Sequence, residues 1–508
     1  MIDLAQITDI ILYQYFRRRQ KKIQHVVDHP EEYQNRLLAK TLLQNQSTAF
    51  GKKYRFDSIQ EVENYRLALP LQNYESLFPY IEKCMDDAAD ILIPGKVKWF
   101  AKSSGTTNAR SKYIPVTQSY LNDGHLKCAW DAASHIYNEN PDAKLFAHKN
   151  LIMGGHLENL DHGKIAGDIS AIILHHFPKI GRRYYTPKFE TALLPDWDLK
   201  IKKIAEETIK EKVTLLAGVP TWTIVLLREI LKQSGKNNIN EVWPDLTTYL
   251  HGGVGFEPFR SEFRKLIPSN QVGFREVYNA SEGYFAMQNN VAEEGMLLLC
   301  DHSIYYEFIP IEEVHNSVPT CLSLEDVSTN ESYAIVITTT AGLYRYVVGD
   351  VITFTSLRPY KIKVTGRINE MINAFGEEVS AYNTDLAIAR CSQQYNVTIR
   401  DYTVAPKYMT DGDKAWHDWY IEFERAPIDI EQFQKSLDEE LQNINSDYAA
   451  KRSSDLAMKN LKITTLPKGS FDAWMRSHNR YGGQTKVPRL SNERSIVVEL
   501  QLATLKPQ

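Results

Sequence analysis

The pattern of hydrophobic and polar positions changes along the chain. Through about the first hundred residues, the apolar positions recur at helical spacing, as in LLAKTLLQNQ, and this pattern stops at Phe50 and Gly51. From KVKWFA onward, short β-rich runs alternate with longer helical runs. The pattern therefore predicts a helical N-terminal segment followed by a mixed α/β region.

The central part of the chain alternates strand and helix. The predicted helices cover residues 119–137, 197–212 and 220–233, and the predicted strands include residues 151–155 and 213–218. Strand, helix and strand in this order are typical of a parallel sheet with crossover helices. We therefore expect an α/β fold in which parallel strands form the core.

Two further segments have a different pattern. Residues 297–311, 332–356 and 360–367 alternate apolar and polar positions, which predicts an antiparallel sheet or a β-barrel-like subdomain. Beyond Gly366, strands such as HDWYIEFE flank the helix DIEQFQKSLDEELQNI. We interpret this last part as a smaller α+β domain.

Composition and charge limit the possible functions. The chain has 508 residues, 43% of them hydrophobic, and a net charge of −4 from 59 basic and 63 acidic side chains. This balance gives no overall field that favours nucleic acid or an anionic membrane. We also find no apolar run of roughly 18 residues, and the N-terminal basic run follows the apolar segment, in the reverse order of a signal peptide.

The cysteines favour a reducing compartment. The five cysteines are scattered, odd in number and without CxxC spacing, which argues against a disulfide framework and a zinc site. We therefore expect a cytoplasmic protein without nucleic-acid or membrane partners. The sequence leaves the oligomeric state open.

A run of small hydroxyl residues, SSGTTNARSK, follows the predicted strand KVKWFA. Gly105 and its neighbours let backbone N–H groups approach an anion, and Lys102, Arg110 or Lys112 can supply positive charge. The run is not a Walker loop, because Arg110 stands where the second glycine of GxxxxGK[ST] is required. Taken alone, it fits either a phosphate-binding loop or an ordinary surface turn.

Several other motifs are incomplete. GGVGF has Pro258 where GxGxxG needs its last glycine, and NASEG misses the nucleophile elbow GxSxG by its first residue. His175 and His176 have neither HExxH spacing nor a cysteine partner, so a structural role is the better interpretation. The sequence therefore supports neither a dehydrogenase nor a hydrolase nor a zinc enzyme.

Two more stretches add nucleotide chemistry. In VYNASEGYF, Tyr278 could stack on a base, Ser281 could contact a phosphate and Glu282 could bind Mg²⁺. In LYRYVVGDV, Asp350 could accept hydrogen bonds from both ribose hydroxyls. Each stretch also has a purely structural explanation, as a helix cap or as a strand that runs into a turn.

Read together, SSGTT with a following lysine, YxxSE, and the YR…GD stretch resemble the three nucleotide-binding motifs of the Gretchen Hagen family. These are the auxin-responsive acyl-acid amido synthetases of the adenylate-forming superfamily. The resemblance extends over nearly the whole chain and includes STAFGKKYRF, LLAGVPTW, HGGVGFEPFR, TGRINEMINAFGEEV and GSFDAWM…GGQTKVPR. It implies that ATP and Mg²⁺ are used to join a small carboxylic acid to an amino acid.

The resemblance also implies roles for individual residues. A phosphate loop would consist of Ser103, Ser104, Gly105, Thr106, Thr107 and Lys112. Gly252 and Gly253 would let adenine approach the backbone, and Tyr278 would stack on it. Ser281 would contact the α-phosphate, Glu282 would bind Mg²⁺, and Asp350 and Arg367 would hold the ribose. Lys486 would be the lysine that the C-terminal domain brings to the reaction.

The domain organisation follows from the same resemblance. It implies a large ATP- and acyl-acid-binding domain with mixed or parallel sheets over residues 1–367, and a smaller, mobile C-terminal α+β lid domain over residues 368–508. The hinge is expected near Arg367 to Glu370. Ala109 stands where the family usually has glycine, which affects the expected turn of the phosphate loop.

The substrates are less defined. For the acyl acid, we expect a mostly apolar pocket with contributions from Cys128, Val219 and Trp222. Two alternatives to amide formation stay open at this point. The acyl-adenylate could be captured by a thiol such as coenzyme A, or the chain could be a non-catalytic nucleotide-binding protein of the same fold.

Overall fold

The computed structural model describes residues 4–103, 112–179, 181–368, 371–372, 377, 379–407, 416–445, 448–449, 452, 458–478, 481 and 487–505. The chain divides into two compact units. Unit 1 comprises Met1–Gly253 and Ser269–Lys363, and unit 2 comprises Val254–Pro268 and Val364–Gln508. Residues 254–268, which lie inside the large domain expected from the sequence, thus belong to unit 2.

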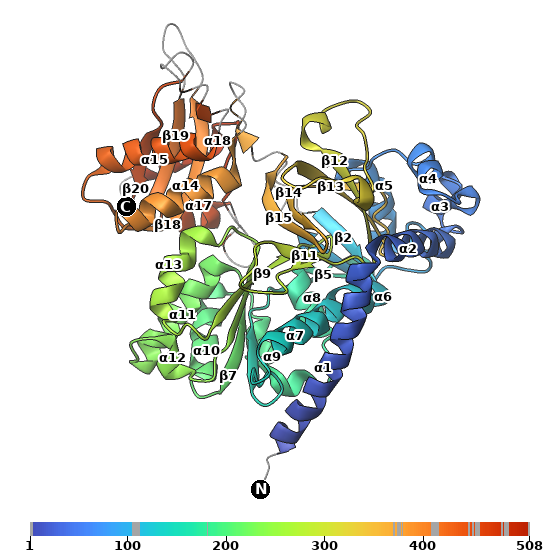
Figure 1. Cartoon of the computed structure of the whole chain (residues 1–508), viewed down its shortest axis with the longest axis horizontal. Helices are drawn as coiled ribbons and strands as arrows, with labels where there is room; N and C mark the ends of the chain where they lie inside the picture. The colour runs from blue at the N-terminus through green and yellow to red at the C-terminus, as the bar shows by residue number, and fades with distance from the viewer. Residues whose placement is uncertain are drawn as a thin grey trace. The chain divides into compact units, whose positions relative to one another are not determined.

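One mixed sheet of 11 strands forms the centre of unit 1 (Figure 1). Its strands, in spatial order, are β12 (Ile304–Pro310), β13 (Ser332–Thr339), β14 (Tyr346–Leu357), β15 (Tyr360–Arg367), β11 (Met296–Leu298), β10 (Tyr284–Met287), β9 (Gly273–Asn279), β8 (Thr248–Gly252), β7 (Val213–Ala217), β3 (Lys149–Ile152) and β6 (Tyr185–Thr186). Of these strands, only β15 extends beyond Lys363, the residue at which unit 1 ends.

The two halves of this sheet match the two sequence patterns. Strands β6, β3, β7, β8 and β9 are parallel, which confirms the expected parallel core with crossover helices. Strand β10 pairs in antiparallel fashion with β9 and β11, β11 pairs so with β15, and β13 pairs so with β12 and β14. These strands continue the same sheet. Because β12 and β6 lie at opposite ends of the strand order, the sheet is open. The antiparallel segment therefore does not form the barrel-like subdomain that was one of the two expectations; it extends the parallel core.

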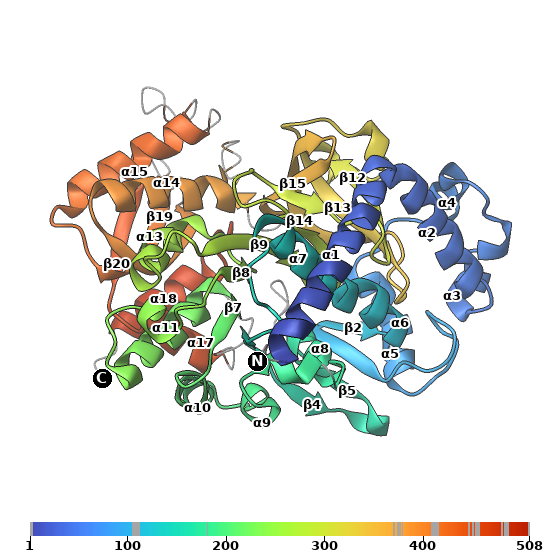
Figure 2. The same ribbon diagram turned by 60° about the horizontal axis from the view of Figure 1, so that its bottom comes forward.

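A second sheet of unit 1 lies beside helix α8 (Ile169–His175), as Figure 2 shows. Its strand order is β2 (Lys112–Val116), β1 (Trp99–Ser103), β5 (Ile165–Gly167) and β4 (Leu157–Asn159). Strands β1 and β2 are antiparallel, and β1 and β5 are parallel. This sheet carries the strands on either side of the hydroxyl-rich run.

The helices of unit 1 surround these sheets. They are α1 (Leu4–Asp28), α2 (Pro30–Asn45), α3 (Ala49–Lys53), η1 (Phe56–Ser58), α4 (Val62–Ala68), α5 (Tyr74–Met85), α6 (Gln118–Tyr120), the π-helical turn η2 (Leu121–Leu126), α7 (Lys127–Glu139), η3 (Asp161–Gly163), α8, η4 (Gly181–Tyr184), α9 (Phe189–Ala192), α10 (Trp197–Thr208), α11 (Pro220–Ser234), α12 (Ile239–Val242), η5 (Ile311–Glu313) and η6 (Leu324–Asp326).

Local sequence signals explain the bounds of the crossover helices. The Asp196 side chain caps α10 by accepting a hydrogen bond from the Leu199 N–H at 2.8 Å. Helix α11 has Pro220 in its first turn and ends at Gly235, whose φ of 67° lies in the left-handed region. These signals agree with the helices expected from the hydrophobic pattern.

A buried charged cluster anchors α1 to the rest of unit 1. Helix α1 packs along α7 (Figure 1), and its Arg19 forms an ion pair with Asp131 of α7. The same carboxylate lies 2.8 Å from Nε2 of His302, and the other ring nitrogen of His302 lies 2.8 Å from Asp301. Because His302 and Asp131 are almost completely buried, their charges depend on compensation within this cluster.

We expect His302→Leu to lower the free energy of unfolding by about 3 kcal/mol, because it removes one partner of a buried ion pair. Urea unfolding monitored by circular dichroism measures this loss. His25→Leu is the matched control, since His25 is exposed, and should cost less than about 0.5 kcal/mol. Equal stability of the two variants would contradict the anchoring role of the cluster.

The same cluster makes stability depend on pH. Burial lowers the pKa of His302, but Cys128, Asp131 and Asp301 outweigh burial and raise this pKa well above its ordinary value. A histidine with a raised pKa contributes its full stability below its unfolded pKa of about 6.5, and this contribution is lost as the pH rises through the folded-state pKa. The difference in unfolding free energy between wild type and His302→Leu should therefore shrink as the pH rises over that interval.

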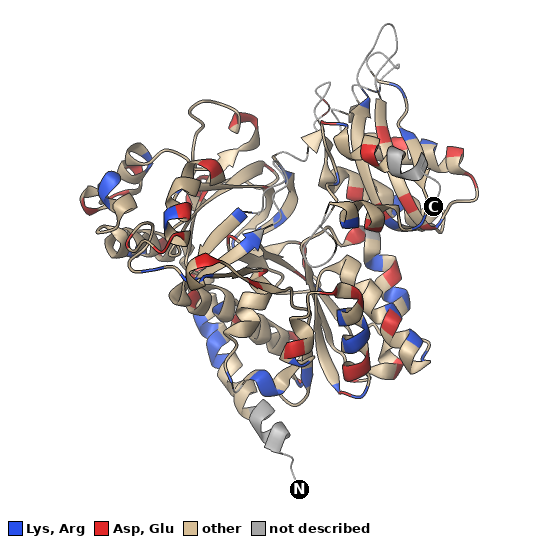
Figure 3. Cartoon of the chain, turned by 180° about the vertical axis from the view of Figure 1, so that it is seen from behind, with Lys and Arg blue, Asp and Glu red and all other residues tan. Residues whose placement is uncertain are grey.

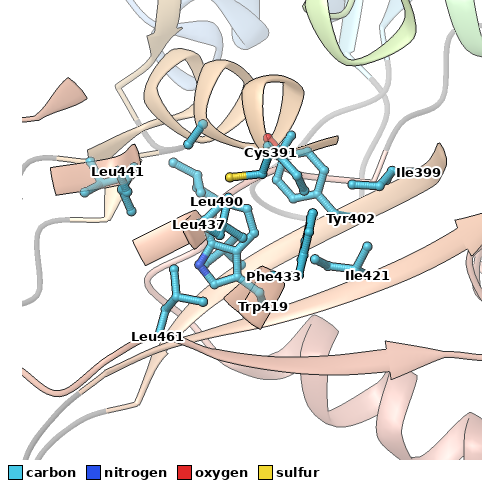
Figure 4. Packing of buried hydrophobic residues seen from close by; sticks show 14 of the residues in the cluster. Cys391, Ile399, Tyr402, Trp419, Ile421, Phe433, Leu437, Leu441, Leu461 and Leu490 are labelled. Atoms are coloured by element: carbon cyan, nitrogen blue, oxygen red, sulfur yellow. The ribbon is translucent and has the colours of Figure 1, made fainter. Parts of the chain in front are cut away.

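Unit 2 packs its helices on a sheet of three strands. The strand order is β18 (Thr398–Lys407), β19 (Trp416–Arg425) and β20 (Lys462–Leu466), and a separate pair consists of β16 (Met371–Ile372) and β17 (Val379–Ser380). The helices of this unit are α13 (Glu257–Leu266), α14 (Ala381–Gln394), α15 (Ile430–Ile444), α17 (Ser470–Ser477) and α18 (Ser495–Leu505). Figure 4 shows its core, in which Trp419, Tyr402 and Phe433 pack with aliphatic side chains. This arrangement confirms the α+β character expected for the C-terminal part.

Charged side chains of both signs are distributed over the elements of the chain, with a basic stretch along α1 (Figure 3). Four exposed side chains, Arg17, Arg18, Lys21 and Lys22, make up this stretch. Among the helices that the structure describes, none combines the length and the apolar composition needed to span a membrane.

Candidate active site

Strands β1 and β2 flank the hydroxyl-rich run. Ser103 ends β1 and Lys112 begins β2, and these two residues pair across the antiparallel ladder. Strands thus flank the loop on both sides, as the sequence predicts. Ser104, Gly105, Thr106 and Thr107 lie outside the described residues.

The basic residues around this loop have different surroundings. The Lys112 ammonium lies 5.7 Å from the centre of the Tyr74 ring, and the Tyr74 hydroxyl accepts a hydrogen bond from the Tyr113 N–H at 2.9 Å. Lys102 instead pairs with Glu158, at 2.8 Å and 3.0 Å from its two oxygens. Lys102 is therefore neutralised by a carboxylate, whereas the contact shown for Lys112 is with an aromatic ring.

The turn after β9 carries the second group of candidate residues. Ala280 and Gly283 exchange backbone hydrogen bonds of 2.8 Å and 3.3 Å, which closes a tight turn around Ser281 and Glu282. The Ser281 hydroxyl lies 3.4 Å from the Lys102 carbonyl of β1, and the Glu282 carbonyl accepts a hydrogen bond from Tyr120 at 2.5 Å. The structure thus brings this turn next to the strand that enters the hydroxyl-rich loop.

Tyr278 and Asp350 meet although 72 positions separate them in the sequence. The Tyr278 hydroxyl donates a hydrogen bond of 2.6 Å to Asp350 Oδ2, and both side chains are buried. Asp350 follows Gly349, whose φ of 93° favours glycine. The Tyr278 ring also packs against Phe285 at 4.5 Å between centroids. An aromatic face and a carboxylate are therefore held together, as a nucleoside requires.

Gly252 and Gly253 lie at the end of β8. A Cβ atom at Gly252 would lie 2.2 Å from the Val277 carbonyl oxygen, so a side chain there would collide with β9. Gly253 has a φ of 85°, a conformation that residues with a side chain rarely adopt. Both positions thus need glycine. As a result, no side chain covers the backbone at the end of β8, beside strand β9, which carries Tyr278.

The structure says less about the surroundings of the remaining candidate site residues. Arg367 ends β15 in unit 2, and Lys486 lies outside the described residues. Val219 and Trp222 begin α11, where the Trp222 ring lies 4.9 Å from that of Trp197. Cys128 is completely buried in a different cluster, with Ala132, Met287 and Leu299. The roles of these residues stay predictions.

Sequence reasoning missed Tyr120 and Tyr346. The Tyr120 hydroxyl donates a hydrogen bond to the backbone of the Ser281–Glu282 turn. The buried Tyr346 hydroxyl has no hydrogen-bond partner among the described residues. Burial and then the charges of Glu282, Glu75 and other neighbours raise the pKa of Tyr346 well above its ordinary value. Tyr346 is part of the LYRYVVGDV stretch, but nothing in that pattern distinguishes its hydroxyl from a core side chain.

The donor groups fit a magnesium ion that arrives with a nucleotide. Within the described residues, we find no group of three or more His, Cys, Asp or Glu side chains that could hold a metal by itself. Magnesium in nucleotide enzymes is bound through one or two carboxylates together with substrate phosphates and water. The buried Glu282 directly follows Ser281, whose hydroxyl lies near the strand that enters the hydroxyl-rich loop, and so offers one such carboxylate.

Comparisons with known proteins agree with this geometry. The model of the GH3 family N-terminal domain matches residues 19–196 and 159–272, that of the central domain matches residues 297–367, and that of the C-terminal domain matches residues 382–495. Indole-3-acetic acid-amido synthetase GH3.6 of Arabidopsis thaliana is 21% identical, over 96% of this chain and 93% of its own. The 4-substituted benzoates-glutamate ligase GH3.12 of the same plant is 20% identical, over 92% and 90%.

Solved structures share the fold. A GH3.15 acyl acid amido synthetase superimposes with a TM-score of 0.79 at 15% identity, covering 96% of both chains. A 2-hydroxyisobutyryl-CoA ligase in its postadenylation state gives a TM-score of 0.58 at 13% identity, covering 94% of this chain and 92% of its own. The α/β fold observed here is thus shared with these two enzymes.

Proposed function

Because the chain belongs to the GH3 (Gretchen Hagen) family, we propose that it is a ligase that activates a small carboxylic acid with ATP and transfers the acyl group to an amino acid. The observation that carries this proposal is the meeting of Tyr278, Asp350, Ser281 and Glu282 beside the strands of the hydroxyl-rich loop. Relatives named as amido synthetases support the amide product.

In the first step, a carboxylate oxygen attacks the α-phosphorus of ATP, and pyrophosphate leaves. Residues 103–107 and Lys112 would hold the phosphates, and Ser281 would contact the α-phosphate. Tyr278 and Asp350 would bind adenine and ribose and so align the nucleotide with the acid. Glu282 would hold Mg²⁺, which when bound offsets the negative charge of the phosphates.

In the second step, the amine nitrogen attacks the acyl carbon, the bond between this carbon and the phosphate oxygen breaks, AMP leaves and the nitrogen loses a proton. We propose that residues 368–508 form a lid domain that moves between the two steps about a hinge near Arg367. Lys486 would then stabilise negative charge only during the first step, and Arg367 would contact the ribose.

The acyl acid is proposed to be small, with an aromatic or aliphatic body. The ring pair of Trp197 and Trp222 supports an apolar pocket at the start of α11, to which Val219 is proposed to contribute. Cys128 is completely buried in a different cluster, so we do not assign it to this pocket. Relatives are named for indole-3-acetic acid and for benzoates. We place the reaction in the cytoplasm, where ATP is available and where the five free cysteines stay reduced.

Acid-dependent release of pyrophosphate tests the proposal. Purified protein is incubated with ATP, Mg²⁺ and a panel of aryl and alkyl carboxylic acids, and products are analysed by mass spectrometry with amino acids or coenzyme A as acceptors. Pyrophosphate with an amide product supports the proposed function. A thioester would favour the thiol alternative, and AMP binding without turnover of any acid would favour a non-catalytic protein.

Tyr278→Phe tests the role of the Tyr278–Asp350 hydrogen bond. The substitution keeps the ring but removes a hydrogen bond to a carboxylate, so the KM for ATP should rise about tenfold. Tyr360→Phe is a matched control, because it removes the 3.0 Å hydrogen bond from Tyr360 to Glu31 on another part of unit 1. An unchanged KM for ATP in Tyr278→Phe would show that this pair does not position the nucleotide.

A further inference from the structure

A pocket of about 380 Å³ lies at the edge of the sheet where the parallel strands begin. Thr248 and Gly273, the first residues of β8 and β9, contribute to it. It is lined by Ile136, Glu139, Asn140, Thr247, Thr248, Gln271, Gly273, Arg275, Asn290, Val291 and Ala292. Tyr278 lies three positions beyond Arg275 on β9, roughly 10 Å along the strand and, because side chains alternate, on the opposite face of the sheet. The pocket is therefore separate from the proposed active site.

An ion pair between a buried arginine and a partly exposed glutamate forms one wall of this pocket. Arg275 of β9 pairs with Glu139 at the end of α7, and the Arg275 side chain is only 6% exposed. The other Glu139 oxygen accepts a hydrogen bond of 3.0 Å from the Val291 N–H. Glu139 thus connects α7 both to the sheet and to the turn between β10 and β11.

The hydrogen-bonding capacity of this wall is not filled. Arg275 donates to the Gln288 carbonyl at 3.2 Å, but its buried Nε–H has no acceptor among the described residues. Burial lowers the pKa of Arg275 to about 10, so the guanidinium stays charged at neutral pH. The buried guanidinium is therefore short of acceptors, and a carboxylate in the pocket that Arg275 lines would supply one.

The charges of Arg275 and Glu139 indicate which kind of ligand the pocket can bind. Arg275 and Glu139 neutralise each other, so a ligand that carries only one sign of charge would be repelled by one of the two side chains. A molecule with both a carboxylate and an ammonium group avoids this repulsion, because the carboxylate accepts from Arg275 and the ammonium pairs with Glu139. Ile136, Val291 and Ala292 add an apolar surface for an aliphatic side chain.

We infer that this pocket binds a free α-amino acid with an aliphatic side chain. The site is distinct from the place where an amino acid would attack the acyl-adenylate. If the proposed function holds, on which this last consequence rests, the chain binds its co-substrate at a second position. Strand β9 connects the two, because it carries both Arg275 and Tyr278.

Calorimetric titration of L-leucine into the full-length protein, without ATP or acid, tests the inference. We expect saturable binding with a Kd below about 1 mM. Val291→Phe should weaken it at least tenfold, since Val291 lies over Gly273, with 3.3 Å between its Cγ1 and a Cβ built at that glycine. Val291 is 42% exposed, so the larger ring should be tolerated. Glu294→Gln, on the same turn but outside the pocket, should bind leucine normally.

Two analogues test the charge argument. The hydroxy acid 2-hydroxy-4-methylpentanoate lacks the ammonium group and leucinamide lacks the carboxylate, so both should bind at least tenfold more weakly than leucine. Leucine affinity that is unchanged in Val291→Phe, or no saturable binding to wild type, would overturn the inference. Pyrophosphate release is measured separately, so a protein that binds leucine here but activates no acid would refute only the proposed function.

Discussion

We expect Glu282→Gln to lower acid-dependent pyrophosphate release about a thousandfold, because the change removes the one charge assigned to the metal. Glutamine keeps the shape of the side chain, so the turn closed by Ala280 and Gly283 should be retained. The Tyr120 hydrogen bond also goes to the Glu282 backbone and not to its side chain. The loss should therefore come from chemistry and not from folding.

The magnesium dependence provides a second readout of this variant. If Glu282 holds the metal together with the nucleotide, the Mg²⁺ concentration for half-maximal activity should rise in Glu282→Gln. Glu312→Gln removes an exposed charge elsewhere in unit 1 and should leave both measurements unchanged. Near-normal activity of Glu282→Gln at ordinary Mg²⁺ would remove Glu282 from the assigned role.

The second large effect is expected for Lys486→Ala. Removing a cation that offsets charge on the phosphates should lower ATP–pyrophosphate exchange by about a hundredfold or more. Amide formation from a supplied acyl-adenylate should be close to normal, because the lid domain is proposed to withdraw this lysine before the second step. This split between the two steps is not expected from general damage to the C-terminal unit.

The control for this variant is Lys468→Ala. Lys468 lies in the same unit, is exposed, and pairs with Glu424 at 3.3 Å, so its loss should affect neither step. Normal ATP–pyrophosphate exchange in Lys486→Ala, with an acid that the wild type activates, would show that the assignment of Lys486 is wrong.

The hydrophobic pattern was sufficient for the order of elements in the parallel half of unit 1. Helices α10 and α11 and strand β7 occur where helical and β-rich spacing predicted them. The barrel-like alternative failed because alternation identifies a strand but not its neighbours. Whether β12–β15 close on themselves or extend another sheet depends on pairings such as that of β11 with β15, which are set by tertiary contacts.

The candidate site was also predictable only in part from the sequence. Motif content pointed to Tyr278 and Asp350, but only the fold places the tyrosine hydroxyl on that carboxylate. Tyr120 carries no motif, and only the fold brings its hydroxyl to the Glu282 carbonyl. Arg275 and Glu139 were not singled out because an ion pair between β9 and α7 leaves no local signal in the sequence.

The route of the carboxylate oxygen tests the central claim most directly. An accepted acid labelled with ¹⁸O in its carboxylate is incubated with ATP, Mg²⁺ and an amino acid, and the products are analysed by mass spectrometry. If the amide forms through an acyl-adenylate, one labelled oxygen must appear in AMP for each amide formed. Amide accompanied by unlabelled AMP, or by ADP and labelled phosphate, would contradict it.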